Sequence, residues 1–256
     1  MTKPIDHGVH LDVDGPIARI TLDRPEQHNA LRLEDVTRLR AQLDEIEGQA
    51  SVRALLLTGS GERTFCAGAS LQQMESGEMS GRIFDTLTDR LAHLSLPTVC
   101  VLNGSIYGGG AELALCCDFR VGSPDVRLSV PAARLGVCYP VGGLGRYVRR
   151  LGLPVASRIL LAAEEMDAAE LHGVGYLTHL VDRDELNDTG EGLAARLSSL
   201  APLAVQSMKR IMLDLAEGVV DEALASELVD RCMTSEDLAE GLTARREGRE
   251  PVFRGR

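Results

Sequence analysis

The chain has 256 residues, of which 44% are hydrophobic, and its formal net charge is −11. This length permits one large domain or a domain with an appendage. Because aromatic residues make up only 3% and Trp is absent, the core must be built from Leu, Val, Ile and Ala. The acidic balance argues against nucleic acid or an anionic membrane as the main partner, although local Arg residues or helix N-termini could still bind a small anion.

Nothing in the sequence predicts membrane insertion or export. There is no apolar run of about 18 residues, and residues 1–8 lack the pattern of a signal peptide. The six cysteines lie in apolar stretches and form no CxxC pair, which predicts buried, reduced thiols in a cytoplasmic protein. They are Cys66, Cys100, Cys116, Cys117, Cys138 and Cys232.

In chain order, the first predicted elements are a β-hairpin and a helix. Residues 7–13 and 16–22 alternate apolar and polar side chains on either side of Asp14-Gly15, which is a strong hairpin signal. Asn29 is a candidate N-cap for the next segment, in which apolar residues recur at helical spacing over residues 36–46.

Short strands and helices then alternate along the chain. Residues 52–57 and 98–102 are predicted to be buried strands, and a helical stretch between them ends at residues 91–96, before Pro97. Further short strands are predicted over residues 119–121 and 126–130. Strands interleaved with helices predict an α/β layered fold.

The C-terminal part of the chain has a different pattern. From about residue 186 onward it is nearly all helical, with segments over residues 193–200, 203–215, 219–232 and 235–246. Ser235, which two acidic residues follow, is a plausible N-cap for the last helix. The sequence therefore predicts a core over residues 1–195 and a C-terminal helical region over residues 196–256.

The most informative segment is PTVCVLNGSIYGGGAELALCCDFR, residues 97–120. Its three glycines precede a predicted helix over residues 111–117 and let the backbone approach a neighbour that a side chain would block. The unpaired N–H groups at the start of such a helix favour negative charge. Glu112 lies three residues after Gly109 and so shares a helix face with it. A base and an amide donor could therefore point into one cavity, which suits proton transfer beside a carbonyl.

The same segment also has a purely structural interpretation, in which the glycines permit close helix packing and Glu112 is a solvated helix residue. It is not a phosphate-binding loop, because neither GxxxxGKS/T nor GxGxxG with a downstream acid is present. A second run of small residues, TFCAGASL at residues 64–71, could hold a ligand against bare backbone. Taken alone, this run is ambiguous too.

Together these segments resemble the enoyl-CoA hydratase/isomerase family, the crotonase superfamily. RPEQHNAL at residues 24–31 resembles the family's RPxxxNAL, and FCAGASL resembles its FCAGADL turn. NGSIYGGGAELALCCDFR resembles NGxxxGGGxELAxxCDxR, and Leu135-Gly136, Gly142-Gly143 and Arg146 fit the later LGxxPxxGGTxR segment. The motifs occur in order and at family spacing from about Asp14 to the C-terminus.

This resemblance implies an α/β crotonase fold, a spiral of ββα units followed by a C-terminal helical trimerisation region. The expected assembly is a homotrimer or a dimer of trimers. The implied activity is that of an enzyme that binds an acyl-CoA thioester and stabilises its enolate. No metal or separate cofactor is implied, since coenzyme A is part of the substrate.

The resemblance also assigns the residues of the site. The thioester oxygen would accept hydrogen bonds from the backbone N–H groups of Ala69 and Gly109, with Glu112 as the catalytic acid or base. Ser70 stands where the family usually has Asp, which puts a side-chain role for that acid in doubt. His28 is interpreted as a rim residue. The residues assigned to substrate binding are Gln27, His28, Ala30, Ala67, Ser70, Leu71, Tyr107, Pro131 and Ala132.

The main departure from the family lies at Val130-Pro131-Ala132. Hydratases of the family carry two glutamates that activate the attacking water, and the second of them, which isomerases also use, would stand at Ala132. A methyl group can neither orient water nor transfer a proton. Tyr139 stands where hydratases usually have Pro, and this pattern resembles methylmalonyl-CoA decarboxylases, whose tyrosine helps to orient the carboxylate. The alternative is that Tyr139 is only a packed side chain.

Other polar residues fit structural roles better. Arg146 is expected to pack near Gly142-Gly143, with a contact to substrate phosphates as the alternative. His93, His172 and His179 have no His or Cys at ligand spacing, so no metal site is predicted.

Three functions follow from the sequence, in this order. The first is a hydratase-type lyase with Glu112 as the single catalytic carboxylate. The second is decarboxylation of a 2-carboxyacyl-CoA such as methylmalonyl-CoA, which Ala132 and Tyr139 favour. The third is a non-catalytic acyl-CoA-binding protein, against which the retention of Glu112 argues.

Overall fold

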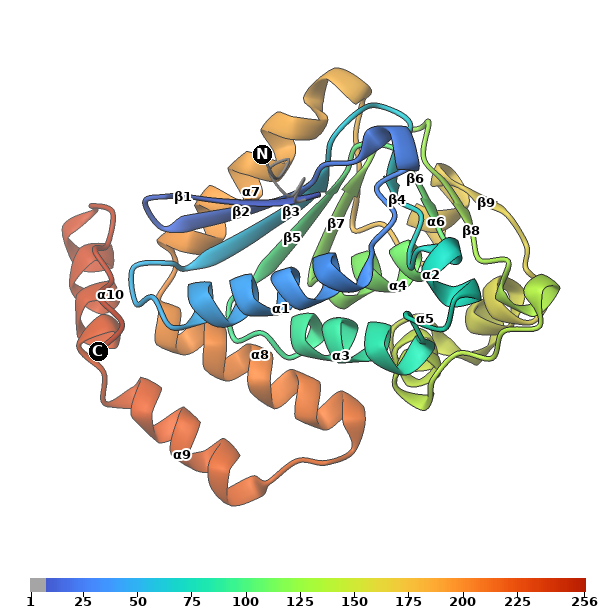
Figure 1. Ribbon diagram of the computed structural model, residues 1–256. Helices are drawn as coiled ribbons and strands as arrows, with labels where there is room; N and C mark the ends of the chain where they lie inside the picture. The colour runs from blue at the N-terminus through green and yellow to red at the C-terminus, as the bar shows by residue number, and fades with distance from the viewer. Residues whose placement is uncertain (1–7) are drawn as a thin grey trace, which may run out of the picture.

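Two β-sheets with helices packed around them make up the computed structural model, which describes residues 8–256 (Figure 1). The larger sheet has the strand order β1-β2-β3-β5-β7-β10, and the smaller sheet has the order β4-β6-β8-β9. The strands are β1 (Val9–Asp14), β2 (Ile17–Leu22), β3 (Ala54–Gly59), β4 (Thr64–Cys66), β5 (Thr98–Leu102), β6 (Ser105–Tyr107), β7 (Phe119–Gly122), β8 (Arg127–Ser129), β9 (Met166–Asp167) and β10 (His179–Leu180).

The N-terminal hairpin forms as predicted. β1 and β2 pair antiparallel, with Val9 opposite Leu22 and Asp14 opposite Ile17. Gly15 supplies the positive φ of 57° that the tight turn requires. His7, the first residue of the predicted hairpin, lies outside the described residues.

The rest of the larger sheet is parallel, and the chain builds it as a spiral. β3, β5 and β7 each enter the larger sheet, and the strand that follows each of them, β4, β6 or β8, enters the smaller sheet. Helices then return the chain for the next turn, as parallel pairing demands. This arrangement confirms the predicted α/β spiral of ββα units.

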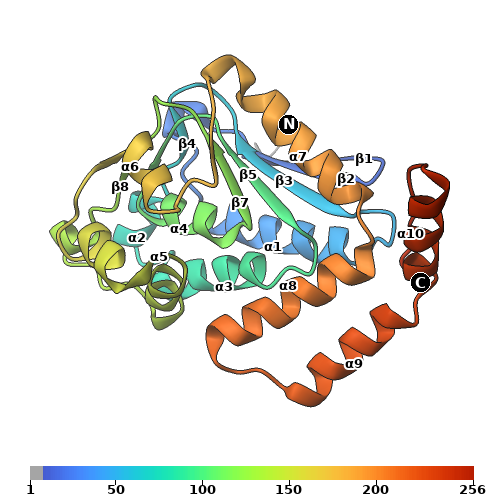
Figure 2. The same ribbon diagram turned by 180° about the vertical axis from the view of Figure 1, so that it is seen from behind.

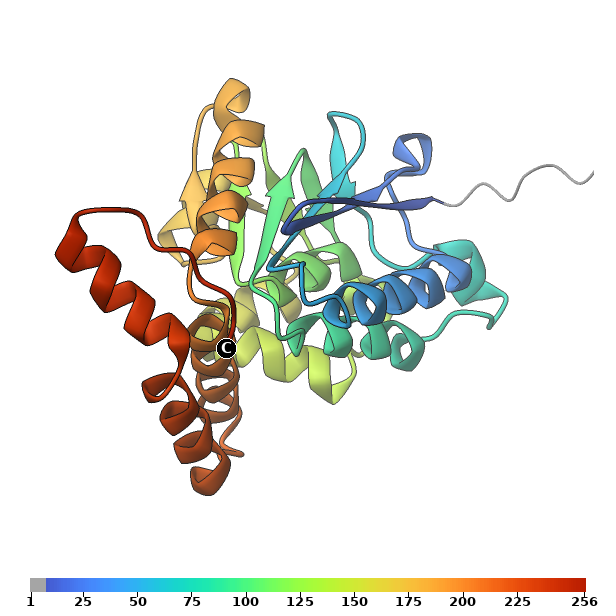
Figure 3. The ribbon, with the colours of Figure 1, turned by 90° about the vertical axis from the view of Figure 1, so that its left-hand side faces the viewer.

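Helices cover both faces of the larger sheet, and Figure 3 shows α1 on one side of the strands and α7 on the other. Consequently Leu55 and Leu57 of β3 belong to the main core, whereas Leu56 between them packs in a second cluster with Leu186 of α7. The helices are α1 (Leu33–Glu47), α2 (Leu71–Glu75), α3 (Gly81–Ala92), α4 (Gly109–Cys116), α5 (Val141–Leu160), α6 (Ala168–Gly173), α7 (Leu186–Ser199), α8 (Pro202–Glu217), α9 (Glu222–Met233) and α10 (Glu236–Glu247).

The last three helices extend from the sheets along one side of the molecule (Figures 1 and 2). Lys209 ties α8 to the core, because its Nζ donates to Asp118 Oδ2 at 2.6 Å and to the carbonyl of Leu96 at 2.8 Å. Ser235 caps α10 as predicted, since its Oγ accepts from the N–H of Leu238 at 3.1 Å. The boundary predicted between residues 195 and 196 falls within α7. None of the helices among residues 8–256 has the length and apolar character needed to cross a membrane.

The predicted cap at Asn29 is wrong, because α1 begins after Arg32 instead. Asn29 has a left-handed backbone with a φ of 52°. Its side chain accepts from the N–H of Arg24 at 2.9 Å and donates to the carbonyls of Ser60 and Thr64, at 3.0 and 2.9 Å. It therefore holds together the loops that lead to the site.

Burial of the cysteines is as predicted for Cys66, Cys100, Cys116 and Cys117, all of which are free thiols. The prediction is wrong for the other two, since Cys138 is exposed and Cys232 is only partly buried.

Candidate active site

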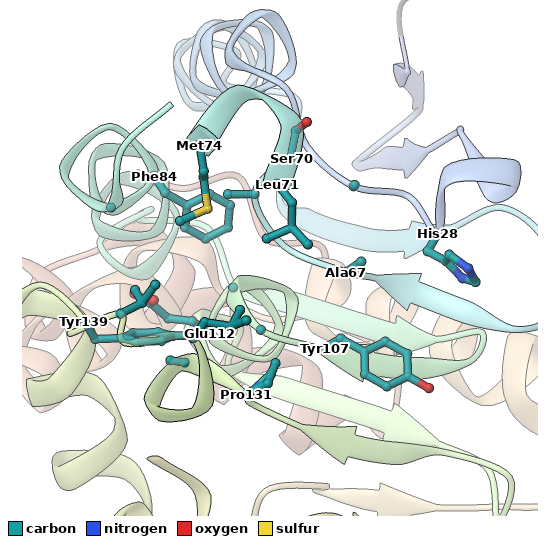
Figure 4. Close-up of a pocket in the computed structure, with 18 of the residues that line it drawn as sticks. His28, Ala67, Ser70, Leu71, Met74, Phe84, Tyr107, Glu112, Pro131 and Tyr139 are labelled. Carbon is teal, nitrogen blue, oxygen red and sulfur yellow. The ribbon is translucent and has the colours of Figure 1, made fainter. Parts of the chain in front are cut away.

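A cavity of about 580 Å³ opens between α2, α3, the start of α4 and residues 131–140 (Figure 4). Every residue assigned to the site from the sequence lines it: Gln27, His28, Ala30, Ala67, Ala69, Ser70, Leu71, Tyr107, Gly109, Glu112, Pro131, Ala132 and Tyr139. Sequence reasoning missed part of the lining, namely Gln72, Met74, Gly81, Phe84, Gly108, Leu135, Val137, Cys138 and Pro140. Of these, Phe84 could have been found from the apolar face of α3, on which it lies with Leu87 and Leu91.

Two glycines, Gly68 and Gly110, allow the two small-residue segments to come into contact. Gly68 has a φ of +88°, and a Cβ there would lie 2.4 Å from the backbone nitrogen of Gly109. A Cβ on Gly110 would lie 2.1 Å from the carbonyl oxygen of Cys66. Since any side chain would force these backbones apart, the glycines are required by the approach of residues 66–69 to the start of α4.

The amides of Ala69 and Gly109 both adjoin the cavity. Leu31 pairs with the 68–70 segment through Gly68 O and Ser70 N, each at 2.8 Å, so the N–H of Ala69 points to the opposite side. Gly109 is the first residue of α4, where a helix offers N–H groups without an intrahelical acceptor. Within residues 8–256, neither N–H has a hydrogen-bond acceptor, so both can donate to a bound oxygen.

Glu112 lies in the first turn of α4 and is only 2% exposed, so the interpretation of it as a solvated residue is wrong. Its carboxylate reaches the cavity (Figure 4). Burial raises the pKa of Glu112, and the guanidinium of Arg146 beside it opposes part of that rise. A buried carboxyl with a raised pKa is a stronger base than an exposed one, which suits it to proton transfer.

Arg146 holds that carboxylate from the protein side. Its Nε and Nη2 donate to Glu112 Oε1 at 3.1 and 2.7 Å. It is itself 3% exposed and does not line the cavity, which excludes a contact to substrate phosphates. Gly143 makes this packing possible, because a Cβ there would lie 3.0 Å from both carboxylate oxygens of Glu112.

Ala132 and the half-buried Tyr139 also line the cavity. The ring of Tyr139 packs edge-on against that of Tyr147, with centroids 6.1 Å apart and an interplanar angle of 84°. Burial and the nearby Glu112 raise the pKa of Tyr139, so its phenol stays neutral and can donate a hydrogen bond. Among the described residues that line the cavity, Glu112 is the only carboxylate.

Exposed polar residues form the other end of the cavity. Figure 4 shows His28 and Tyr107 at this end, away from Glu112 and Tyr139. Nδ1 of His28 lies 2.9 Å from Thr64 Oγ1, and the carbonyl of His28 accepts from the N–H of Ala67 at 2.9 Å. The cavity therefore has a polar mouth and an apolar inner end that contains one carboxyl and one phenol.

The chain belongs to the enoyl-CoA hydratase/isomerase family, whose model matches residues 12–256. It is 33% identical over 245 residues to a short-chain-enoyl-CoA hydratase of Clostridium acetobutylicum, covering 93% of this chain and 94% of that one. It is 29% identical over 250 residues to a crotonyl-CoA hydratase of Syntrophomonas wolfei, covering 95% and 96%. The crystal structure of an enoyl-CoA hydratase from Bacillus anthracis superposes with a TM-score of 0.89 at 27% identity, over 97% of this chain and all of the other.

Proposed function

We propose that this protein is a hydratase-type lyase that adds water across the double bond of an enoyl-CoA. One observation carries the proposal: a buried carboxylate, Glu112, adjoins the same cavity as the amides of Ala69 and Gly109, which have no acceptor among residues 8–256. The names of the relatives, a short-chain-enoyl-CoA hydratase and a crotonyl-CoA hydratase, support the same reaction. The coenzyme A part of the bound substrate would extend out of the cavity through the polar mouth near His28 and Tyr107.

In this reaction the thioester oxygen becomes anionic as water attacks the β-carbon. The amides of Ala69 and Gly109 would stabilise that charge, and a donor of this kind contributes about 3–4 kcal/mol elsewhere. The carboxylate of Glu112 takes a proton from the attacking water and returns one to the α-carbon, so that the product contains one added water. No resident cofactor takes part in this proposal.

Decarboxylation of a 2-carboxyacyl-CoA is the second candidate, and the pairing of Ala132 with Tyr139 favours it. The charges that line the cavity make decarboxylation the less favoured of the two reactions. None of the described residues that line the cavity is Lys or Arg, so a substrate carboxylate would face Glu112 without a counter-ion. A non-catalytic acyl-CoA binder ranks third, because binding alone does not need a carboxylate held out of water at a cost in stability.

A substrate panel tests these functions. Crotonyl-CoA, a 3-enoyl-CoA and methylmalonyl-CoA are each offered to the purified protein, with loss of enoyl absorbance and release of carbon dioxide as readouts. Hydration of crotonyl-CoA is expected, and Glu112→Gln is expected to lower kcat by about 10²–10⁴ while acyl-CoA still binds. Glu45→Gln makes the same chemical change on the exposed face of α1 and serves as the control.

Other outcomes of the panel would replace the proposal. Carbon dioxide release from methylmalonyl-CoA without hydration would make the protein a decarboxylase, and Tyr139→Phe would then test the phenol. Tight acyl-CoA binding without any turnover, and unchanged in Glu112→Gln, would make it a binder.

We also propose that the chain assembles as a homotrimer, or as a dimer of trimers, through its C-terminal helices. Their large apolar side chains are unusually exposed, which is typical of an interface: Met208 56%, Met212 62%, Leu215 60%, Val229 50% and Met233 64%. Light scattering after gel filtration measures the mass, and Met212→Lys is expected to shift it toward the monomer. An unchanged mass distribution in this variant would exclude that face.

The buried free thiols support a cytoplasmic location, because reducing conditions keep such residues unpaired. Exhaustive dialysis against a chelator is expected to leave hydration unchanged, and a loss of activity that a metal restores would contradict the proposed absence of a cofactor.

A further inference from the structure

One guanidinium joins three helices directly behind the carboxylate of Glu112. Besides its two hydrogen bonds to Glu112 Oε1, Arg146 donates from Nη2 to Asp85 Oδ1 at 2.5 Å and to Thr88 Oγ1 at 2.7 Å. Its Nη1 donates to Asp89 Oδ1 at 2.7 Å. Arg146 lies on α5, Glu112 on α4, and the other three residues on α3. The side chain is therefore fixed from α3 and fixes the carboxylate of α4 in turn.

The geometry of the pair leaves part of the carboxylate available. Both guanidinium hydrogen bonds to Glu112 end on Oε1, so Oε2 has no guanidinium partner. Gly143 packs close on one side, since a Cβ there would lie only 3.0 Å from either carboxylate oxygen. Because χ angles of a glutamate would otherwise be free, these contacts select one orientation of the carboxylate toward the cavity.

The charges around Arg146 do not balance. One guanidinium meets three carboxylates, those of Asp85, Asp89 and Glu112. Asp85 raises the pKa of Glu112, whereas Arg146 lowers it. The groups that face Glu112 are Asp85 and Thr88 on α3, Cys116 on α4, Tyr139, and Arg146 and Tyr147 on α5. Arg146 and Asp85 thus act on the same carboxyl in opposite directions.

We infer that Arg146, held by Asp85 and Asp89, is a positioning residue that orients the Glu112 carboxylate and sets its charge for the proton transfers. This inference rests on the proposed function, because it concerns the carboxyl to which that function assigns the chemistry. Arg146 acts only through Glu112, since it does not line the cavity and cannot touch the substrate.

Kinetics of Arg146→Met test the orienting role. The expected result is a fall in kcat of about 100-fold, with KM for crotonyl-CoA changed by less than about threefold. Arg146→Lys, which keeps the charge but loses the forked geometry, is expected to recover about a tenth of the wild-type rate. The matched control is Arg149→Met on the same helix, which removes a partly exposed ion pair with Glu217 and is expected to leave kcat unchanged.

Titration of Glu112 tests the charge role without requiring turnover. Infrared difference spectra, with Glu112→Gln as the subtraction, follow protonation of this carboxyl. Arg146→Met is expected to move the midpoint to higher pH, and the isosteric Asp85→Asn to move it to lower pH. Shifts of opposite sign would not arise from a merely structural role. If Arg146→Met fails to fold, the midpoint measured in Asp85→Asn still tests the charge role.

The two proposals can fail separately. If the wild-type protein does not hydrate any enoyl-CoA but the midpoints shift as stated, the positioning role stands and the proposed function fails. If hydration depends on Glu112 while Arg146→Met keeps wild-type kcat, or while neither variant moves the midpoint, the positioning role is refuted.

Discussion

Gly143 offers a direct measure of how tightly the Glu112 carboxylate is held. A Cβ at this position would lie 3.0 Å from both carboxylate oxygens and 3.1 Å from Cδ, whereas ordinary contact begins at 3.4 Å. In Gly143→Ala the carboxylate must therefore move by about 0.4 Å, the difference between 3.4 and 3.0 Å. It cannot swing away freely, because its Oε1 accepts both hydrogen bonds from Arg146.

The expected effect separates catalysis from stability. Ala is favoured over Gly inside a helix by up to about 1 kcal/mol, which offsets the cost of crowding the carboxylate. The free energy of unfolding should then stay within about 1 kcal/mol of wild type. A misplacement of about 1 Å can cost 100-fold in rate, so a shift of about 0.4 Å is expected to lower kcat about five- to tenfold.

Gly145→Ala is the matched control, because it lies on the same helix and gains the same helix propensity. The nearest atom to its Cβ would be the end of the Arg149 side chain, at 2.6 Å, and that end can move. Both variants are assayed for crotonyl-CoA hydration and for thermal unfolding. Equal kcat values in the two variants, both close to wild type, would refute the claim that the position of the carboxylate limits the rate.

Two further predictions concern stability. Burial raises the pKa of Glu112 above 4.5, so ionisation of this carboxyl lowers the free energy of unfolding. This loss of stability is absent below the pKa of the unfolded chain and complete above the pKa of the folded protein. The Tm of Glu112→Gln should therefore rise relative to that of wild type as pH increases from about 4 to 8, and a constant difference in Tm would contradict this.

Lys209→Met leaves Asp118 without its buried cation, and we expect it to lower the free energy of unfolding in urea by about 3 kcal/mol. Arg210→Ala breaks only the i,i+4 pair with Asp214 and should lower it by less than about 1 kcal/mol.

The parts of the site that depend on the backbone could be predicted from the sequence. Gly68 and Gly110 are needed because other backbones come too close for a Cβ, so the constraint is visible in the residue itself. The hairpin could also be predicted, because Asp14-Gly15 allows the turn and the alternation of apolar and polar residues on either side determines which faces are buried. In the hairpin the local sequence carries the whole requirement, whereas the glycines mark a close approach without naming the partner backbone.

The parts that depend on distant contacts could not be predicted. Arg146 and Glu112 are 34 residues apart in the sequence, and Asp85 is 61 residues from Arg146, so no local pattern links them. The helix cap predicted at Asn29 was wrong for a different reason. Asn is favoured both as a helix cap and in left-handed loop positions, and only the neighbouring loops, through Ser60 and Thr64, decide between the two.

Glu112 is the only carboxylate among the described residues that line the cavity, and its surroundings are consistent with that. Where two carboxyls share a site, one can stay ionised while the other stays protonated. In the proposed reaction, with Ala132 in place of the second acid, Glu112 alone both accepts and releases a proton, and a raised pKa favours its release from water and return to carbon. Burial raises the pKa of Glu112, and the guanidinium of Arg146 opposes part of that rise. A charged neighbour that is itself held by Asp85 and Asp89 can provide this balance without entering the cavity.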